Sequence, residues 1–292
     1  MKRVLITGAN SYIGTSFEKW ARTHYASEIY IETLDMQNSE WREKNFSDYD
    51  VIFHVAGIAH AYNEENEEVK ARYFAVNRDL AIETAKKAKN EGVKHFIFMS
   101  SMLVYGSQYQ RINENTIPKP LTSYALSKWQ ADEGIRALAD EKFCVAMLRP
   151  PMIYGKNCKG NYPLLSKIAK IAPFFPDYKN ERSMLFIENL CEFVCNVIIK
   201  EKSGIFFPQN SDYVQTSEMV REIAKVNGHK IFISRFFNFL VNVGIHIKPF
   251  RISEKISKAF WSLTYEKSMS EYDFDYRVAD FVTSIKLTEG KN

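Results

Sequence analysis

Several features are scarce in this sequence of 292 residues, and each absence excludes a class of protein. The 12 glycines and 9 prolines are too few for a low-complexity or collagen-like chain. The longest apolar stretch, from Phe236 to Ile247, contains two asparagines and is far shorter than the roughly 20 residues of a membrane-spanning helix. The N-terminus lacks the apolar core of a signal peptide, and we therefore expect a cytoplasmic protein.

Cysteine pairs and an excess of charge are missing as well. The four cysteines, at positions 144, 158, 191 and 195, form no C-x-x-C pair and have no histidines at zinc-site spacing, so we expect buried apolar thiols and no metal. The 39 basic and 35 acidic residues nearly balance, which argues against a dedicated nucleic-acid-binding protein. The 46% of hydrophobic residues is ordinary for a globular chain that buries a sizeable core.

Short apolar runs alternate with helical patterns along the first half of the chain. Strands are expected at 3–7, 29–35, 51–56, 95–100 and 143–149, and helices at 11–25, 66–90 and 122–140. This alternation predicts an α/β fold of the Rossmann type, a doubly wound parallel sheet with helices on both faces.

The pattern changes after residue 155. Helices are expected at 163–171, 188–200, 216–227 and at the end of the chain, with a short strand near 204–207. We therefore predict a nucleotide-binding domain over residues 1–155, completed by returning C-terminal pieces. A smaller, mostly helical substrate lobe is expected over residues 156–292.

A glycine-rich turn follows the first expected strand, in the sequence V-L-I-T-G-A-N-S-Y-I-G at 4–14. Gly8 permits a tight turn and Gly14 permits close helix packing, so the free N–H groups of the helix N-terminus can face a pyrophosphate. Asp35 closes the second strand, where a carboxylate accepts the ribose hydroxyls of NAD and repels the 2′-phosphate of NADP. Glu32 is an alternative for this ribose contact. The remaining alternative is a plain strand-turn-helix corner with a solvated aspartate.

A second pattern, formed by Ser101, Tyr124 and Lys128, can transfer a proton. Ser101 directly follows an expected strand, and Tyr124 and Lys128 lie four residues apart, on one face of an expected helix. A free tyrosine has a pKa near 10 and is a poor base at neutral pH, but a nearby ammonium favours its phenolate. Ser101 can donate a hydrogen bond to the same substrate oxygen. The three residues are therefore candidate catalytic residues for the oxidation of an alcohol or the reduction of a carbonyl group.

These motifs and their order resemble the extended short-chain dehydrogenase/reductase superfamily, in its NAD-dependent epimerase/dehydratase branch acting on nucleotide sugars. The resemblance covers nearly the whole chain. It rests on T-G-A-N-S-Y-I-G at 7–14, D-V-I-F-H-V-A-G at 50–57, Y-F-A-V-N at 73–77, S-S-M-L-V-Y-G at 100–106, Y-A-L-S-K at 124–128 and L-R-P-P-M-I-Y-G at 148–155.

The resemblance implies NAD as the cofactor and assigns most of the site. The residues expected to contact NAD are Gly8, Ser11, Tyr12, Ile13, Gly14, Asp35, Ala56, Gly57, Asn77, Tyr124, Lys128 and Pro151. The nucleotide sugar, expected to be a UDP-sugar, is assigned to Asn161 in G-N-Y-P-L-L and to Arg182 in R-S-M-L-F-I-E-N-L. A guanidinium suits a diphosphate, although Arg182 could instead be a surface residue paired with Glu181 or Glu188.

Departures from the family pattern narrow the expected reaction. Ser11 replaces the middle glycine of the phosphate motif, and the stretch between Asp35 and Asp50 is short. Met102 and Leu103 follow Ser101 where 4,6-dehydratases carry an Asp-Glu pair, which disfavours water elimination. A 4-epimerase is expected, with a 4-keto reductase of surface-polysaccharide synthesis and a non-catalytic NAD-binding protein as the alternatives. Met152, where galactose-type epimerases tend to carry Asn, weakens a specific galactose assignment.

Two further expectations concern partners. Many relatives pair through a four-helix interface that includes the Tyr–Lys helix, so we expect a homodimer. Residues 231–262 mix aromatic with basic side chains, as an interfacial helix would, although ordinary packing of the smaller lobe is favoured. His60 follows the strand at 51–56 and is a weak candidate for sugar contact.

Overall fold

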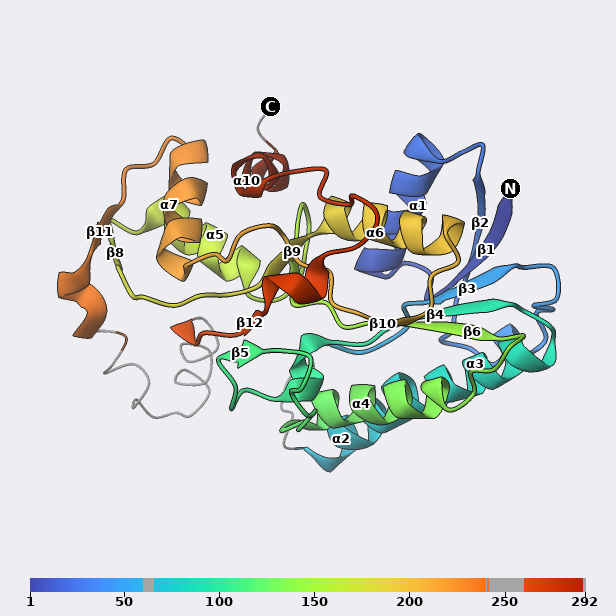
Figure 1. Ribbon diagram of the computed structural model, residues 1–292. Coiled ribbons are helices and arrows are strands. Elements are labelled where there is room, and N and C mark those ends of the chain that lie inside the picture. Colours follow the sequence, from blue (N-terminus) through green and yellow to red (C-terminus); the bar gives the residue numbers. More distant parts are fainter. Residues whose placement is uncertain (60–65, 240, 242–259, 291–292) are drawn as a thin grey trace.

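The computed structural model describes residues 1–59, 66–239, 241 and 260–290, and a parallel sheet forms its centre (Figure 1). Six strands lie in the order β10-β6-β4-β3-β1-β2, and every pairing between them is parallel. The strands are β1 (Lys2–Thr7), β2 (Ile29–Leu34), β3 (Val51–His54), β4 (His95–Met99), β6 (Cys144–Leu148) and β10 (Gly204–Phe206). The strands expected from the sequence are confirmed within one or two residues.

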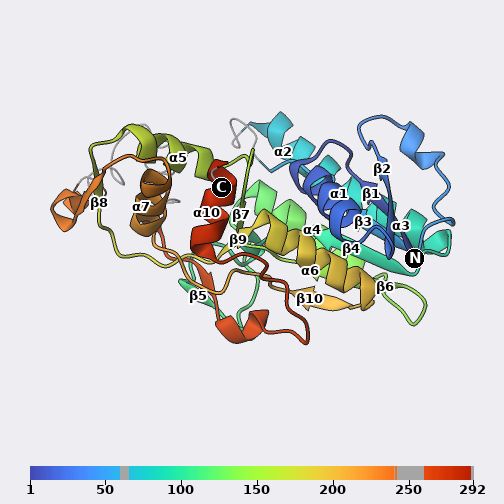
Figure 2. The same ribbon diagram turned by 90° about the horizontal axis from the view of Figure 1, so that it is seen from above.

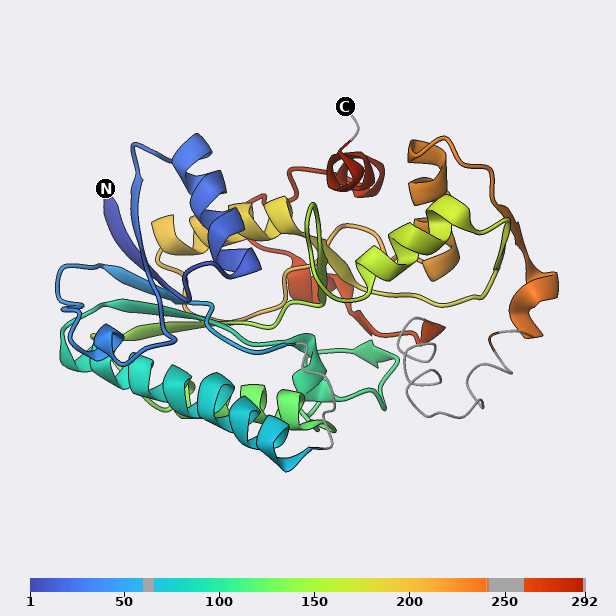
Figure 3. The same cartoon turned by 180° about the vertical axis from the view of Figure 1, so that it is seen from behind.

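Helices cover both faces of this sheet, as the views from above and from behind show (Figures 2 and 3). On one face α1 (Tyr12–His24) lies beside α6 (Ile187–Ile199). The other face carries α2 (Glu67–Tyr73), the π-helix η2 (Phe74–Asp79), α3 (Leu80–Asn90) and α4 (Ser123–Arg136). The predicted doubly wound architecture is confirmed.

The apolar runs of the strands explain why both faces are covered. All four residues of β3 and all five of β4 are buried. Alternate side chains point to opposite faces, so Phe53 and Ile97 join one hydrophobic cluster while Ile52 and Phe96 join the other. Continuous apolar strands of this kind are typical of a parallel sheet that is covered twice.

The helix expected over residues 66–90 contains an irregularity that periodicity did not indicate. Its middle, η2, is a π-helix, and such wide turns are frequent at functional sites.

The short stretch after Asp35 adds no strand to the sheet. Residues 35–50 contain a 3₁₀ helix, η1 (Glu40–Arg42), and no strand. β2 is therefore an edge of the sheet.

Beyond the sheet, helices α5 (Tyr162–Ile171), α7 (Thr216–Val226) and α10 (Phe281–Glu289) gather at the opposite end of the molecule (Figure 2). Pairs of very short strands accompany them, and these pairs had no sequence signal. They are β5 (Arg111–Ile112) with β12 (Thr264–Tyr265), β7 (Met152–Tyr154) with β9 (Met184–Phe186), and β8 (Phe174–Pro176) with β11 (Phe232–Ser234). Three further 3₁₀ turns are η3 (Met102–Tyr105), η4 (Arg235–Phe237) and η5 (Lys267–Ser270).

Two elements of the later half pack with the first. α6 lies on α1, and β10 extends the central sheet beside β6. The division near residue 155, with its returning pieces, stays a prediction. Cys158, Cys191 and Cys195 are free and buried, which confirms the apolar thiols, whereas Cys144 is half-buried.

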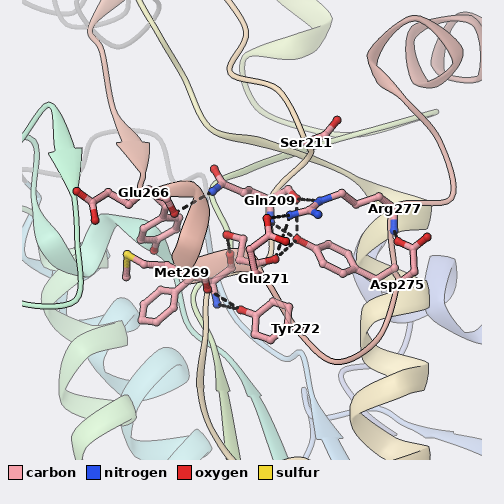
Figure 4. A network of polar contacts seen from close by, with 12 residues as sticks. Gln209, Ser211, Glu266, Met269, Glu271, Tyr272, Asp275 and Arg277 are labelled. Atoms are coloured by element: carbon pink, nitrogen blue, oxygen red, sulfur yellow. Dashed lines mark hydrogen bonds and ion pairs between the residues drawn. The ribbon is translucent and has the colours of Figure 1, made fainter.

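A network of polar contacts connects residues 266–277 to the segment that follows β10 (Figure 4). The Arg277 guanidinium donates from Nε to the carbonyl oxygen of Gln209 at 3.2 Å and from Nη2 to that of Ser270 at 3.0 Å. The Tyr276 hydroxyl also donates to the Gln209 carbonyl, at 2.7 Å. Gln209 lies three residues after β10, so these contacts hold the segment beside the chain that leaves β10.

Candidate active site

The carboxyl ends of the parallel strands meet at one edge of the sheet, and the glycine-rich turn lies there. Gly8 has a φ of +119°, and a Cβ at this position would lie 2.6 Å from the Ala56 nitrogen. A Cβ on Gly14 would lie 3.2 Å from side-chain carbons of Ile6 and Val55. Both positions therefore require glycine, the first for the turn and the second for close packing of α1.

Ser11, which replaces the middle glycine of the motif, is the N-cap of α1. Its Oγ accepts a hydrogen bond from the Gly14 nitrogen at 3.1 Å. Serine is among the preferred N-cap residues, so this departure from the family pattern stabilises the start of the helix. Tyr12 and Ile13 form the first turn of α1 and pack against the hydrophobic core.

The structure distinguishes Asp35 from Glu32, the alternative residue for the ribose contact. Asp35 is exposed just beyond β2, where one carboxylate oxygen accepts the Gln37 N–H at 2.9 Å. Glu32 lies inside β2 and accepts hydrogen bonds from the Tyr49 hydroxyl at 2.6 Å and from Lys44 at 3.2 Å. The Tyr49 contact holds the pKa of Glu32 below its ordinary value. Glu32 is therefore a structural residue, and Asp35 is the candidate for a ribose contact.

A cavity of about 380 Å³ lies next to Asp35. Residues 36–39 and η1 form one wall, and η2 with the start of α3 forms the other. The short stretch after β2 thus forms a hollow beside the ribose candidate.

Lys128 is buried at the centre of this edge. Its Nζ donates to the carbonyl oxygen of Met99, the last residue of β4, at 2.8 Å, and lies 4.6 Å from the centre of the Phe98 ring. Burial lowers the pKa of Lys128 to about 7. The ammonium therefore lies directly beside the Ser100–Ser101 segment, as a proton relay would need.

Asn77 links the end of β3 to the helix that carries Lys128. Its side-chain oxygen accepts the Ile58 N–H at 2.8 Å, and its amide donates to the Ile58 carbonyl at 3.0 Å and to Ser127 Oγ at 3.2 Å. A Cβ on Gly57 would lie 3.1 Å from the Asn77 oxygen and 3.2 Å from Lys128 Nζ. The contacts hold the 56–58 backbone, where the predicted cofactor residues Ala56 and Gly57 lie, against α4.

Ser101 and Tyr124 complete the predicted catalytic set. Ser101 is half-buried and caps η3, its Oγ accepting the Leu103 N–H at 3.2 Å. Tyr124 lies one turn before Lys128 on α4, with its ring 5.9 Å from that of Tyr73. α4 packs against η3, so the helix of Tyr124 and the turn capped by Ser101 are neighbours. Pro151 follows Pro150, whose carbonyl accepts the Met102 N–H at 2.9 Å.

The two predicted substrate residues belong to the other lobe. Asn161 precedes α5 and is half-buried. Arg182 bridges the backbones of Val214 and Leu263 and precedes β9, whose Met184 pairs with Met152 of β7. Burial lowers the pKa of Arg182 to about 10. The pairing of β7 with β9 thus brings the segment that follows Arg182 beside the segment that follows Pro151.

Glu181, one of the two acidic residues considered as partners of Arg182, has another partner. Glu181 forms its ion pair with Arg111, at 3.3 Å. His60 lies outside the described residues. Among the described residues no group of three or more histidine, cysteine or acidic side chains could hold a metal ion.

Sequence reasoning missed one titratable residue at the site. His54 ends β3, is fully buried and shares a hydrogen bond of 2.8 Å between its Nδ1 and Thr7 Oγ1. Burial, with the charge of Lys128, lowers the pKa of His54 to about 3, so the imidazole is neutral at physiological pH. Inside an apolar strand it gave no signal in the sequence.

A phosphate-binding turn, an acidic residue after β2 and a tyrosine–lysine pair beside β4 are the parts of a dinucleotide-dependent oxidoreductase of the short-chain dehydrogenase type. The model of the NAD dependent epimerase/dehydratase family matches residues 4–206. The chain belongs to this family, which confirms the resemblance, the enzyme class and the NAD dependence inferred from the motifs.

Two curated relatives are named as 4-epimerases. The chain is 29% identical to a UDP-glucose 4-epimerase of Vibrio cholerae over 248 residues, covering 76% of this chain and 75% of the relative. It is 27% identical to an N-acetyl-alpha-D-glucosaminyl-diphospho-ditrans,octacis-undecaprenol 4-epimerase of Escherichia coli O157:H7, covering 65% of this chain and 61% of the relative.

Solved structures share the fold. The UDP-N-acetylglucosamine 4-epimerase of Bacillus cereus has a TM-score of 0.76 at 15% identity, with 99% of both chains covered. The Bordetella bronchiseptica enzyme WbmG, solved in complex with NAD, has a TM-score of 0.72 at 19% identity, covering 99% of this chain and 93% of that one.

Proposed function

We propose that this protein is a nucleotide-sugar 4-epimerase that inverts one sugar carbon by reversible hydride transfer to NAD. The observation that carries the proposal is the position of Lys128, buried on the helix of Tyr124 and bonded to the end of β4 beside Ser101. The 4-epimerases among the curated relatives support the reaction type. The dehydratase reaction is disfavoured because Met102 and Leu103 cannot transfer protons.

The residues present fit the cofactor. Gly8 lies so close to the Ala56 backbone that a Cβ would come within 2.6 Å of its nitrogen, which keeps the turn tight, and Asp35 is exposed at the end of β2. NAD, when bound, supplies the acceptor and later the donor of the hydride. We assign the dinucleotide to the turn at 8–14, to Asp35, to the Ala56–Gly57 backbone with Asn77, and to Lys128 with Pro151.

The chain's own residues carry out the proton transfer. Tyr124 takes the proton of the sugar hydroxyl as the carbonyl forms, and returns it when the hydride comes back to the other face of the sugar. Lys128, one turn away, favours the phenolate form of Tyr124. Ser101 donates a hydrogen bond to the same sugar oxygen and so fixes its position.

The leading alternative is a 4-keto reductase, which needs the same three residues. A dTDP-4-dehydrorhamnose reductase of Clostridium acetobutylicum shares the fold, with a TM-score of 0.65 at 18% identity, covering 79% of this chain and 83% of that one. Denaturing the purified protein and identifying the released nucleotide separates the two. Retained NAD, with interconversion of UDP-sugar epimers, supports the epimerase. A protein that releases no nucleotide and consumes added NADH or NADPH with a keto sugar supports the reductase.

The position of Asp35 predicts a preference for NAD over NADP. The exposed carboxylate would repel a 2′-phosphate, and its replacement in Asp35→Ala should reduce the ratio of the two affinities. Isothermal titration with both cofactors measures the ratio, with Glu32→Ala as the matched control, because Glu32 is engaged by Tyr49 and Lys44. Tighter binding of NADP to the wild type would remove Asp35 from the ribose site.

Arg182→Ala should weaken the binding of UDP and leave NAD binding intact. A charge-assisted contact to phosphate contributes roughly 1.5–3 kcal/mol, which is about ten- to a hundredfold in affinity. The dissociation constants of UDP and NAD, measured separately, test this. Arg111→Ala is the control, because Arg111 lies on the neighbouring strand and pairs with Glu181. An unchanged affinity for UDP would place Arg182 outside the substrate site.

We also propose a contact between the smaller lobe and a lipid surface. Phe232, Phe236 and Phe239 are 65%, 76% and 52% exposed, and Arg235 lies among them. Residues 240 and 242–259 of the segment noted in the sequence lie outside the described part. Within the described part no helix is long and apolar enough to cross a membrane.

Vesicles containing anionic lipid test the lipid contact. We expect the protein to sediment with them, and Phe236→Ser together with Phe239→Ser to abolish this. A wild-type protein that remained in the supernatant would contradict the contact.

The homodimer and the cytoplasmic location remain proposals. Pairing through a four-helix interface that includes α4 is the arrangement that the family resemblance implies. Light scattering during gel filtration should give twice the chain mass of 33.9 kDa. A monomer at micromolar concentration would overturn the pairing.

A further inference from the structure

A buried arginine connects the segments that carry the predicted catalytic residues. Arg149 follows β6 and is only 2% exposed. Its Nε and Nη2 donate to the two carboxylate oxygens of Asp132, each at 2.9 Å, and Nη1 donates to the Tyr105 hydroxyl at 2.7 Å. The guanidinium also lies 5.2 Å from the centre of the Trp129 ring. The guanidinium is therefore held on three sides.

Each of these partners belongs to a different part of the site. Asp132 lies on α4, one turn after Lys128 and two turns after Tyr124. Tyr105 ends the η3 turn that Ser101 caps. Arg149 itself precedes Pro150, whose carbonyl accepts the Met102 N–H. One side chain thus connects α4, η3 and the segment of Pro151.

We propose that Arg149 is a positioning residue that fixes Tyr124, Ser101 and Pro151 relative to one another. A planar guanidinium that uses both edges at once sets an angle as well as a distance between its partners. The fully buried Asp132 compensates the charge of the buried Arg149 guanidinium. The inference rests on the proposed function for its kinetic consequence.

Arg136 provides a matched control. It pairs with the same Asp132 at 2.8 Å and lies 5.5 Å from the same Trp129 ring. However, Arg136, Asp132 and Trp129 all belong to α4, so these two contacts lie within one helix and do not connect α4 to η3 or to the segment of Pro151. If activity were lost on removal of any cationic partner of Asp132, the loss would appear in variants of both Arg149 and Arg136.

The experiment compares Arg149→Met with Arg136→Met in proteins shown to be folded by circular dichroism. We expect kcat to fall about a hundredfold in Arg149→Met, as small misplacements of reacting groups do, with KM changed much less. Arg136→Met should stay within about twofold of the wild type. Arg149→Lys should recover only part of the loss, since a lysine keeps the charge and loses the two-edged geometry.

Tyr105→Phe keeps the proposal testable if Arg149→Met does not fold. It removes one hydroxyl from the junction, and we expect a loss of about tenfold in kcat, the scale of one hydrogen bond to a charged group. In the double variant with Arg149→Met, where that protein folds, the two losses should not multiply.

Binding of NAD gives a readout that does not depend on the sugar. Because Lys128 and Pro151 are assigned to the cofactor, we expect its dissociation constant to rise about tenfold in Arg149→Met and to stay unchanged in Arg136→Met. If the wild type converted no nucleotide sugar while this difference held, the proposed function would fail and the positioning role would stand. If Arg149→Met and Tyr105→Phe matched the wild type in both measurements, Arg149 would position nothing.

Discussion

Tyr124→Phe is expected to lose at least about 10²–10⁴ in the rate of hydride transfer while the fold and NAD binding survive. The change removes a single oxygen atom from a ring that remains packed near Tyr73. Lys128 cannot replace the missing base, because its Nζ is bonded to the Met99 carbonyl and lies one helical turn away. The proton of the sugar hydroxyl then has no positioned acceptor.

The measurement is the pH profile of turnover for the wild type and the variant. The rising limb of the wild-type profile should vanish in Tyr124→Phe. Ser101→Ala should cost less, since a hydroxyl that orients the sugar carries no charge in the reaction. Near-native turnover of the Phe variant with an unchanged profile would favour a non-catalytic NAD-binding protein.

Lys128→Met should inactivate the enzyme and at the same time stabilise the fold. Burial lowers the pKa of Lys128 to about 7, whereas an unfolded chain leaves it near 10.4. Between these two pH values the unfolded chain holds a proton that the folded protein has released. Stability therefore rises with pH through this window, and below pH 7 the folded protein bears the full cost of a buried ammonium.

A methionine side chain does not ionise, so the stability gained in Lys128→Met relative to the wild type is greatest below pH 7 and decreases towards pH 10. Each pKa unit corresponds to about 1.4 kcal/mol, and part of the gain is offset because the Met99 carbonyl loses its donor. We expect a net gain on the order of 2 kcal/mol at pH 6, hence a rise of several degrees in Tm. Calorimetry at pH 6 and pH 9.5 checks the sign. A lower Tm at pH 6 would show that the ammonium is not strained by burial.

The sequence predicted the parts of the site that depend on local signals. Gly8 and Gly14 are detectable because a turn and a close approach each leave only one residue type possible. The strands β1, β3, β4 and β6 were found because most of their residues are buried and form continuous apolar runs.

The remainder depends on contacts between distant residues. Neither the ion pair between Asp132 and Arg149 nor the neutral His54 can be read from spacing, since each partner comes from a different strand or helix. The strands β5 and β12 contain two residues each, too few for any periodicity to show. Glu32 and Asp35 were distinguishable only once the contacts of Glu32 with Tyr49 and Lys44 were seen.

Because of the π-helix at Phe74–Asp79, the site depends on the number of residues in this segment as well as on their types. A wide turn accommodates one residue more than a regular α-helical turn would, and Asn77 lies within it. Deleting one residue there would convert the wide turn into a regular α-helical turn and displace Asn77 from its contacts with Ile58 and Ser127. Substitutions at Ala75 or Asp79, which are exposed and line the hollow beside Asp35, would leave the number of residues in the turn unchanged. This segment should therefore tolerate replacement of its exposed residues far better than the loss of any single one.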